Sequence, residues 1–268
     1  MHTFLKYFFS LSFFITCGIS LSAQGISMSP TRLFFTGNPG ETVSQPVILS
    51  NSSATDYVFN VNVKDWKREE DGNKIYFEPN TLPNSNALWI STLESSINLP
   101  AKSDKEIIVT MKIPLQASAS QVTNSMLFFT QIGKQKDIAE HQKGIGIIAL
   151  FEFGLHIYFT PAQNTNQSLD ITSIQEVFED GIDTRKVLVG IENDGNVVND
   201  ATVELELTNT SSGAEIKLDP INISMIPGAK QVVSFQLPKD IKGTFLGVSI
   251  IKMAGTNDLR VGEKTFEF

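Results

Sequence analysis

The stretch of sequence that decides the fold is SMSPTRLFFTGNPGE, residues 27–41. It predicts a β-strand, because Leu33 and Phe35 fall on one face when side chains alternate with a period of two. Arg32 places a positive charge at the start of this apolar run. Two interpretations are open: an edge residue whose side chain is solvated, or an anchor whose guanidinium binds an anion.

Alternation of this kind continues along the chain. The clearest run is YVFNVNVKDW (57–66), in which Phe59 and Val63 share one face. A turn signal, Asp71–Gly72, follows this run and predicts a hairpin. The run ALWIST (87–92) is also predicted to be a strand, and no convincing amphipathic helix pattern is found.

Turn signals divide the chain into two halves of similar layout. The segment PAQNTNQS (161–168) is polar and is predicted to be a linker. About seven short strands at regular spacing lie on each side of it, as is typical of β-sandwiches. The predicted fold class is therefore all-β, with two immunoglobulin-like β-sandwich domains in tandem. We expect these domains to cover residues 24–161 and 162–268.

The N-terminus has the layout of a secretory signal peptide. Lys6 supplies a positive charge, residues 7–19 form a short apolar segment, and small residues follow as far as Ala23. Cleavage after Ala23 would make residues 1–23 a signal peptide and leave no stable membrane span. An uncleaved anchor and a lipoprotein attached at Cys17 are the alternatives. Cys17 is the one cysteine, so the exported domains would contain no disulfide.

The composition argues against several classes of function. A formal net charge of -8 disfavours nucleic-acid binding, which uses a basic surface. Beyond the predicted signal peptide, His141 and His156 are the histidines of the sequence, and they lack the spacing of metal ligands. No nucleophile motif and no glycine-rich phosphate loop is present in the sequence. We therefore expect a protein that is not an enzyme and that uses no metal and no cofactor.

The longest apolar run is GIGIIALFEFGLHIYFTP (144–161). Its alternate residues form an apolar face that is longer than one sandwich strand needs. The members of this face are Ile145, Ile147, Ala149, Phe151, Phe153, Leu155, Ile157 and Phe159. One interpretation is a long central strand that is buried on this face. The other is that its N-terminal part offers alternate side chains and an unpaired strand edge to a partner.

Two motifs carry a resemblance to a known family. They are SPTRLFFTGNPGETVSQPVILSNSS (29–53) and, much later, LHIYFTP (155–161). In these motifs the chain resembles the periplasmic pilus-assembly chaperones, the PapD-like group. The resemblance implies export to the periplasm and a chaperone that stabilises pilin-like subunits by donor-strand complementation. The implied partners are exported β-rich subunits of this type and an outer-membrane assembly platform.

The resemblance also implies roles for individual residues. Arg32 matches the arginine that grips the subunit's C-terminal carboxylate, and His156 occupies the position of the lysine that assists it. The implied donor-strand residues are Ile145, Ile147, Ala149, Phe151 and Phe153. On this basis Arg32 is an anion anchor rather than a solvated edge residue.

The sequence departs from the family pattern at three places. His156 stands where the family has a lysine, so the second grip would be neutral above the pKa of the imidazole. Thr160 replaces an arginine, and Asn124 and Ser125 stand where a glutamate is usual. The ionic contact that those residues build between the two domains of the family is therefore not expected.

A second function remains open on the sequence alone. The run 87–114 would also suit a structural or adhesive envelope protein made of two immunoglobulin-like modules. The face formed by residues 145–153 distinguishes the two functions. A chaperone would leave part of this face exposed in the absence of a client, whereas a plain sandwich would bury it.

Overall fold

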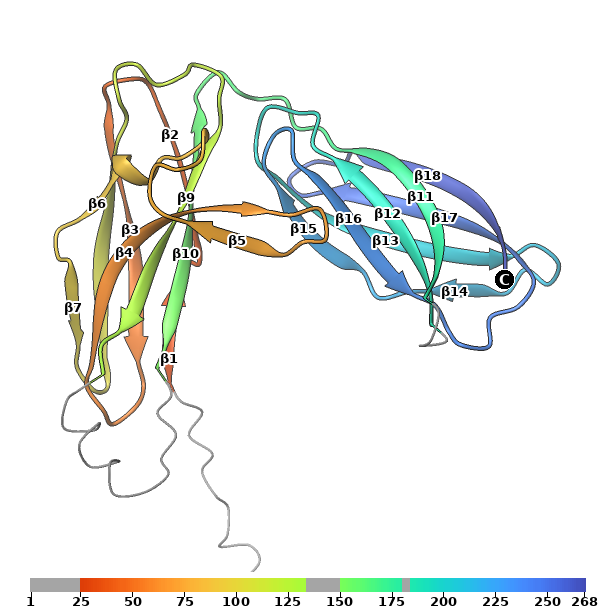
Figure 1. The fold of residues 1–268 in the computed structure, drawn as a ribbon, viewed down its shortest axis with the longest axis horizontal. Helices are drawn as coiled ribbons and strands as arrows, with labels where there is room; N and C mark the ends of the chain where they lie inside the picture. Colours follow the sequence, from red (N-terminus) through yellow and green to blue (C-terminus); the bar gives the residue numbers. More distant parts are fainter. Residues whose placement is uncertain (1–24, 134–149, 180–183) are drawn as a thin grey trace, which may run out of the picture.

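The computed structural model describes residues 25–133, 150–179 and 184–268, so the predicted signal peptide lies outside the described residues. The strands form two β-sandwiches that follow one another along the chain (Figure 1). The prediction of an all-β fold with two sandwiches in tandem is confirmed. The last strand of the first sandwich ends at Pro161, and the first strand of the second begins at Asp170.

The N-terminal sandwich consists of two sheets. One sheet has the strand order β1-β3-β8-β6, and the other has the order β2-β10-β9-β4-β5 with β7 paired to β4. The strands are β1 (Ile26–Ser29), β2 (Arg32–Gly37), β3 (Thr42–Asn51), β4 (Tyr57–Arg68), β5 (Lys74–Phe77), β6 (Ile90–Thr92), β7 (Ser96–Leu99), β8 (Ser103–Lys112), β9 (Thr123–Gln131) and β10 (Glu152–Pro161).

The C-terminal sandwich also has two sheets, which do not share strands with the first pair. Their orders are β11-β12-β16 and β14-β13-β17-β18, and β15 pairs with β13. The strands are β11 (Asp170–Glu179), β12 (Thr184–Glu192), β13 (Asn199–Asn209), β14 (Glu215–Lys217), β15 (Ile221–Met225), β16 (Lys230–Gln236), β17 (Thr244–Met253) and β18 (Leu259–Glu267).

Each sandwich is held together by its own apolar core. In the N-terminal sandwich Leu33 and Phe35 of β2 are buried, as their shared face predicts, and they belong to the same core as Phe59, Phe129 and Phe159. A separate cluster fills the second sandwich. Burial of these apolar side chains from water is the main term that stabilises each sandwich.

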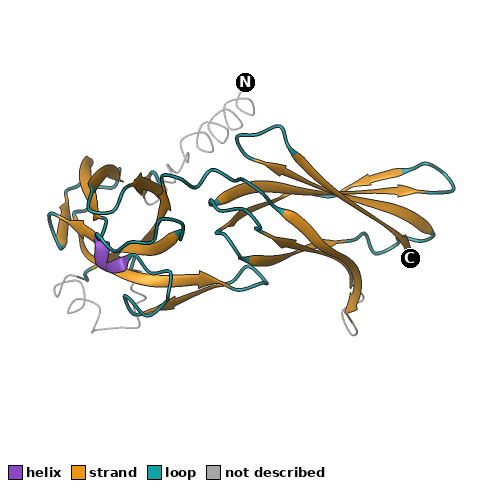
Figure 2. Cartoon of the chain, turned by 90° about the horizontal axis from the view of Figure 1, so that it is seen from above, coloured by secondary structure: helices purple, strands orange, loops and turns teal. Residues whose placement is uncertain are grey.

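A third apolar cluster lies on the outer face of the sheet that contains β4, β9 and β10. It is formed by Trp66, Met126, Phe128 and Tyr158, and Val198 and Ile226 of the second sandwich pack against it. This cluster joins the two sandwiches. In Figure 2 the two sandwiches follow one another end to end along the molecule, and the one short helix of the described residues lies in the N-terminal sandwich.

The β4–β5 hairpin reaches from the first sandwich to the second (Figure 1). It turns at the predicted position, where Gly72 adopts a left-handed φ of 90° that favours glycine. Near the tip, the carbonyl oxygen of Glu70 accepts a hydrogen bond of 2.6 Å from the amide of Val232. Val232 belongs to β16, a strand at the edge of its sheet, so the hairpin docks against an available strand edge.

The structure corrects two predicted strands. Ala87–Trp89 form a short 3-10 helix, η1, and only Ile90–Thr92 are extended. The run 144–161 does not form one continuous strand in the described residues, because β10 begins at Glu152 and residues 150 and 151 precede it. Residues 144–149 lie outside the described part of the chain.

Candidate functional site

One side of β10 is only partly covered by another strand. β10 pairs with β9 over residues 152–159, whereas β2 pairs only with His156–Pro161. In the described part of the chain, no strand pairs with Glu152–Leu155 on the side away from β9. The short β1, which precedes β2, pairs with β3 in the opposite sheet. The first half of β10 therefore presents an open edge.

The hydrogen bonds show which backbone groups face this edge. The amide of His156 donates to the carbonyl of Thr31 at 3.1 Å, on the β2 side. The carbonyl of Phe151 accepts from the amide of Gln131 at 2.8 Å, on the β9 side. Because backbone groups in a strand alternate between its two sides, Glu152 and Gly154 direct their N–H and C=O groups to the open edge. Such unpaired groups are a template for another strand.

The side chains of this segment divide between the core and the surface. Phe153 lies 5.9 Å from Phe59 between ring centroids, and Phe151 lies 5.9 Å from Tyr57, so both rings are partly buried against the core. Leu150 is 56% exposed. Of the five predicted donor residues, Phe153 lies in β10 and Phe151 lies immediately before it. Ile145, Ile147 and Ala149 lie outside the described residues.

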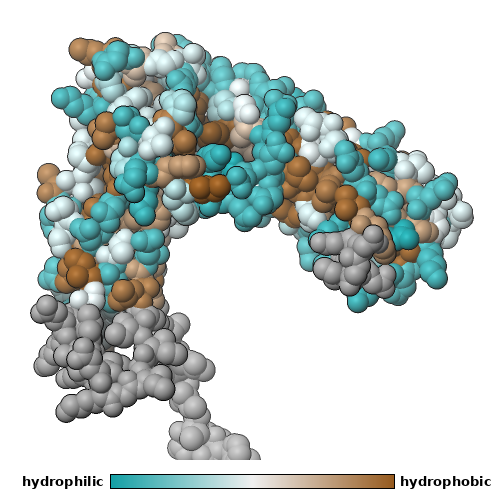
Figure 3. Space-filling view, viewed as in Figure 1, coloured by the Kyte–Doolittle hydropathy of each residue, from teal (hydrophilic) through white to brown (hydrophobic). Residues whose placement is uncertain are grey.

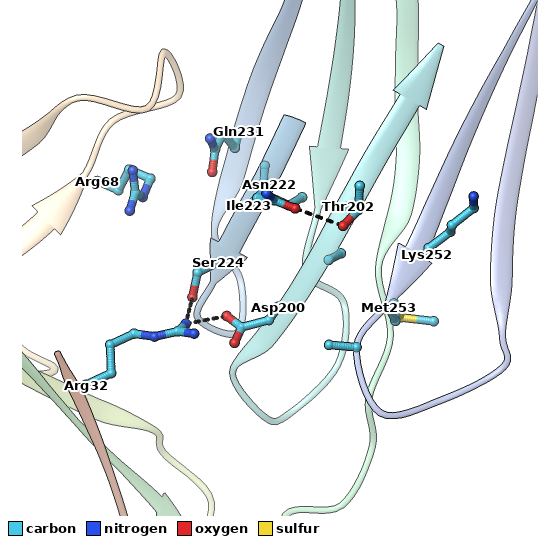
Figure 4. A pocket seen from close by; sticks show the side chains of 12 residues that line it. Arg32, Arg68, Asp200, Thr202, Asn222, Ile223, Ser224, Gln231, Lys252 and Met253 are labelled. Atoms are coloured by element: carbon cyan, nitrogen blue, oxygen red, sulfur yellow. Dashed lines mark hydrogen bonds and ion pairs between the residues drawn. The ribbon is translucent and has the colours of Figure 1, made fainter. Parts of the chain in front are cut away.

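The side chain of Arg32 is hydrogen-bonded to the second sandwich rather than surrounded only by solvent. Its Nη1 donates to Asp200 Oδ1 at 2.7 Å and to Ser224 Oγ at 3.4 Å, both in the second sandwich (Figure 4). The hydrogen bond that Arg32 donates to Asp200 raises the pKa of Arg32 above its ordinary value. The carboxylate that Arg32 binds in this structure is thus a residue of the same chain. The two side chains are 38% and 33% exposed, so the ion pair is accessible to water.

This ion pair joins the two sandwiches at a position that the sequence analysis did not anticipate. Asn124, at the place of the family's glutamate, donates from Nδ2 to the carbonyl of Trp66 at 3.0 Å and accepts from Asn84 at 2.6 Å. These bonds stay within the N-terminal sandwich. The ionic contact between the domains is made instead by Arg32 with Asp200.

A cleft of about 650 Å³ lies between the sandwiches beside this ion pair. Its lining includes Arg32, Arg68, Asp200, Ser224, Gln231 and Lys252. Figure 4 shows Arg32 and Arg68 entering from the N-terminal sandwich toward the strands of the second. The two sandwiches meet at an angle, and the space-filling view shows the concave side of this bend (Figure 3). The cleft therefore combines surfaces from both sandwiches.

His156 lies opposite Arg32 in the parallel pairing of β10 with β2. Its ring packs edge-on against Trp66 at 5.0 Å and is stacked with Tyr158 at 6.2 Å. Burial, followed by repulsion from Lys74, lowers the pKa of His156 from its ordinary value of 6.5 to about 4. At neutral pH the imidazole is uncharged. The structure brings Arg32 and His156 together, but His156 supplies no positive charge there.

The lowered pKa of His156 makes a prediction about pH. Between pH 6.5 and pH 4 the unfolded chain binds a proton that the folded state does not, so His156 makes stability fall as pH falls through this window. In His156→Phe the loss of stability from pH 7 to pH 5 should be smaller by about 1 kcal/mol, after allowance for solvent screening. Urea unfolding of both proteins at the two pH values measures this difference. Equal losses would contradict the prediction.

Two further basic residues of the site were missed by the sequence reasoning. Arg68 of β4 and Lys74 of β5 are opposite one another across the hairpin. Neither has an acidic partner within ion-pair distance among the described residues. The turn signal alone does not give this pairing, because a two-residue loop at Asp71–Gly72 would place Ile75, and not Lys74, opposite Arg68.

The described residues contain no group of three or more potential metal ligands. No helix among them has the length and apolar character needed to cross a membrane.

Comparisons with known proteins concern the whole chain. No protein-family model and no curated protein matches it. Similar solved structures include the class 5 fimbriae chaperone CfaA, with 14% identity over 90% of this chain and 99% of that chain and a TM-score of 0.49. The YadV chaperone has 11% identity, coverage of 90% and 99%, and a TM-score of 0.49. The E. coli chaperone DraB has 10% identity, coverage of 90% and 98%, and a TM-score of 0.48.

All three of these structures are chaperones, and CfaA is a fimbriae chaperone, in agreement with the family that the sequence motifs resemble. At identities of 10–14% the likeness concerns the fold alone. The function has to be argued from the strand edge and the cleft.

Proposed function

We propose that this chain is a periplasmic chaperone that binds exported β-rich subunits by strand addition at the open edge of β10. The observation that carries the proposal is the uncovered side of Glu152–Leu155. Glu152 and Gly154 direct backbone donors and acceptors to that side, and a strand of a client would pair with them. The partly buried rings of Phe151 and Phe153 would form the start of the apolar face presented to the client.

The cleft supplies a second element of the proposal. A client strand that runs along β10 toward β2 reaches the cleft lined by Arg32. We assign this cleft to the client's C-terminal carboxylate, as the resemblance to the pilus-assembly chaperones implies. Export through the N-terminal segment and delivery of the client to an outer-membrane assembly platform belong to the same proposal.

The substitution Glu152→Pro tests strand addition. Proline lacks the N–H that faces the open edge, and it is tolerated at the first residue of a strand. We expect client capture to fall by about tenfold or more, since a backbone hydrogen bond is lost and the approach of a strand is hindered. The measurement is a pull-down of the mature protein from its own envelope fraction, with bound proteins quantified by mass spectrometry.

The matched control is Glu152→Ala, which keeps the backbone N–H. Both variants lose the hydrogen bond of 2.7 Å that Glu152 Oε2 accepts from Thr130 Oγ1, so this loss cancels in the comparison. Capture by the alanine variant should equal that of the wild type. Equal capture of β-rich subunits by the proline variant would refute strand addition at this edge. Recovery of envelope polymer by all three proteins would support the structural envelope module instead.

A further inference from the structure

The β4–β5 hairpin carries two neighbouring cations, Arg68 and Lys74, of which Arg68 lines the cleft. Arg68 enters the cleft from the N-terminal sandwich, as Arg32 does (Figure 4). Lys74, its cross-strand neighbour, lies with Nζ 5.7 Å from the centre of the Trp66 ring and is partly buried. Like charges directly opposite on two strands repel each other. This placement is unfavourable unless an anion compensates it.

The position of Arg68 is fixed by both sandwiches. Its Nη1 donates to the carbonyl of Gly72 at 2.8 Å, which ties the side chain to the turn of the hairpin. The turn is tied in its own right to the second sandwich by the hydrogen bond between Glu70 and Val232. The guanidinium is therefore held in place before any ligand arrives, and a ligand would lose less entropy in ordering it.

Part of the donor capacity of Arg68 is unused. Its Nε is buried and has no hydrogen-bond partner among the residues that the structure describes. Buried N–H groups are nearly always paired, and one without a partner is costly. A carboxylate pairs with two donors of a guanidinium at once, so an oxygen pair at the edge formed by Nε and Nη2 would satisfy this group.

The acidic residues near the cleft do not neutralise these cations. Asp200 is paired with Arg32 at 2.7 Å. Glu204 is paired at 2.6 Å with Lys252, which lines the cleft. The acids at the exposed tip of the hairpin, Glu69, Glu70 and Asp71, form no ion pair with Arg68 or Lys74. Burial and repulsion from Arg68 lower the pKa of Lys74, which agrees with an uncompensated positive charge.

We propose that Arg68 and Lys74 form a carboxylate-binding site at the cleft, while Arg32 remains paired with Asp200. The hairpin pair then supplies the charge that neutral His156 does not. The inference rests on the proposed function, because the natural ligand would be the C-terminal carboxylate of a bound subunit. It differs from the expectation for Arg32, whose charge is already matched within the chain.

The test titrates the mature protein at constant ionic strength with an N-acetylated tripeptide that ends in a free carboxylate, and with the same tripeptide ending in an amide. The readout is the indole N–H of Trp66 in NMR spectra, because Lys74 lies over this ring. We expect a saturable shift with the free carboxylate and none with the amide. A saturable shift with the amide, or none with either, would overturn the proposal.

Four charge-removing variants make the test specific. Arg68→Gln should weaken binding of the tripeptide by about tenfold, and Lys74→Met by about threefold to fivefold. Lys252→Met is the matched control, since it removes a cation from the same cleft that is already paired. Its affinity should stay within about twofold of the wild type. Equal weakening by Lys252→Met, or greater weakening by Arg32→Gln than by Arg68→Gln, would overturn the proposal.

Two comparisons distinguish the carboxylate site from a phosphate site and from strand addition at β10. Inorganic phosphate is the second probe, and tighter binding of phosphate than of the tripeptide would overturn the assignment to a carboxylate. Binding of a tripeptide does not need strand addition at β10. Absence of tripeptide binding together with loss of capture by Glu152→Pro would refute only the carboxylate site. Tripeptide binding together with undiminished capture by Glu152→Pro would refute only strand addition.

Discussion

Replacing Trp66 by alanine should lower the free energy of unfolding of the N-terminal sandwich by about 3–5 kcal/mol, the usual cost of removing a large buried aromatic side chain. Trp66 is 4% exposed, and its Nε1 donates to the carbonyl of Ser125 at 3.1 Å. Its ring contacts His156 and Tyr158 and belongs to the cluster that Val198 and Ile226 complete. The substitution therefore opens a cavity between the sandwiches as well as beneath the cleft.

Denaturant unfolding gives the change in stability, and small-angle X-ray scattering gives the change in shape. We expect Trp66→Ala to broaden the distribution of angles between the sandwiches as well as to destabilise the protein. Trp66→Phe is the control, because it keeps an aromatic ring in the cluster and removes only the indole N–H and part of the volume. A loss of less than about 1 kcal/mol in the alanine variant would show that the cluster is not a packed interface.

Asp65→Ala should destabilise the same sandwich by about 3 kcal/mol or more, because it leaves buried donors without an acceptor. Asp65 is fully buried, and its Oδ2 accepts hydrogen bonds from the amides of Thr81 at 2.7 Å and Leu82 at 2.8 Å. Its Oδ1 accepts from Ser85 Oγ at 2.5 Å. These bonds hold the segment that follows β5 against the base of the hairpin.

The control for this prediction is Asp65→Asn, which keeps one carbonyl oxygen as an acceptor and should lose about half as much stability. Thermal unfolding of the wild type, Asp65→Ala and Asp65→Asn gives the order of their stabilities. Hydrogen exchange at the amides of Thr81 and Leu82 reports directly on the two bonds. Unchanged protection of these amides in Asp65→Ala would contradict the assigned role of the carboxylate.

Asp65 and Trp66 are neighbours in β4, and the burial of both could not be predicted from the alternation of apolar and polar residues. The pattern in residues 57–66 places Phe59 correctly in the core, and the Asp71–Gly72 turn is where the sequence puts it. Alternation requires that one of Asp65 and Trp66 be exposed, yet both are buried. The segment after β5 covers Asp65, and the second sandwich covers Trp66. Both covering segments lie outside β4, so the pattern within residues 57–66 carries no information about them.

The candidate site, like the fold of β4, could be predicted from the sequence only in part. The sequence singles out Arg32 and His156, and the structure places them opposite one another on β2 and β10. The partner of Arg32 was not predictable, because Asp200 lies 168 positions away and alternation gives no information on contacts between domains. The neutral state of His156 also depends on burial by tertiary packing. The pairing of Arg68 with Lys74 was not predictable either, because the register of a hairpin depends on the length of its loop, and the Asp71–Gly72 signal implies a register shifted by one residue.

The docking of the hairpin on β16 has a mechanical consequence. Two domains joined by a single linker are expected to rotate about it unless their interface restrains them. Here the sandwiches are connected by residues 162–169, and they are further restrained by the interdomain ion pair, by the apolar cluster between them and by the bond from Val232 to Glu70. A hinge that is restrained at several separate points loses most of its rotational freedom. Because the hairpin carries one of these restraints, a force that moves one sandwich is transmitted through the hairpin to Arg68 at the cleft.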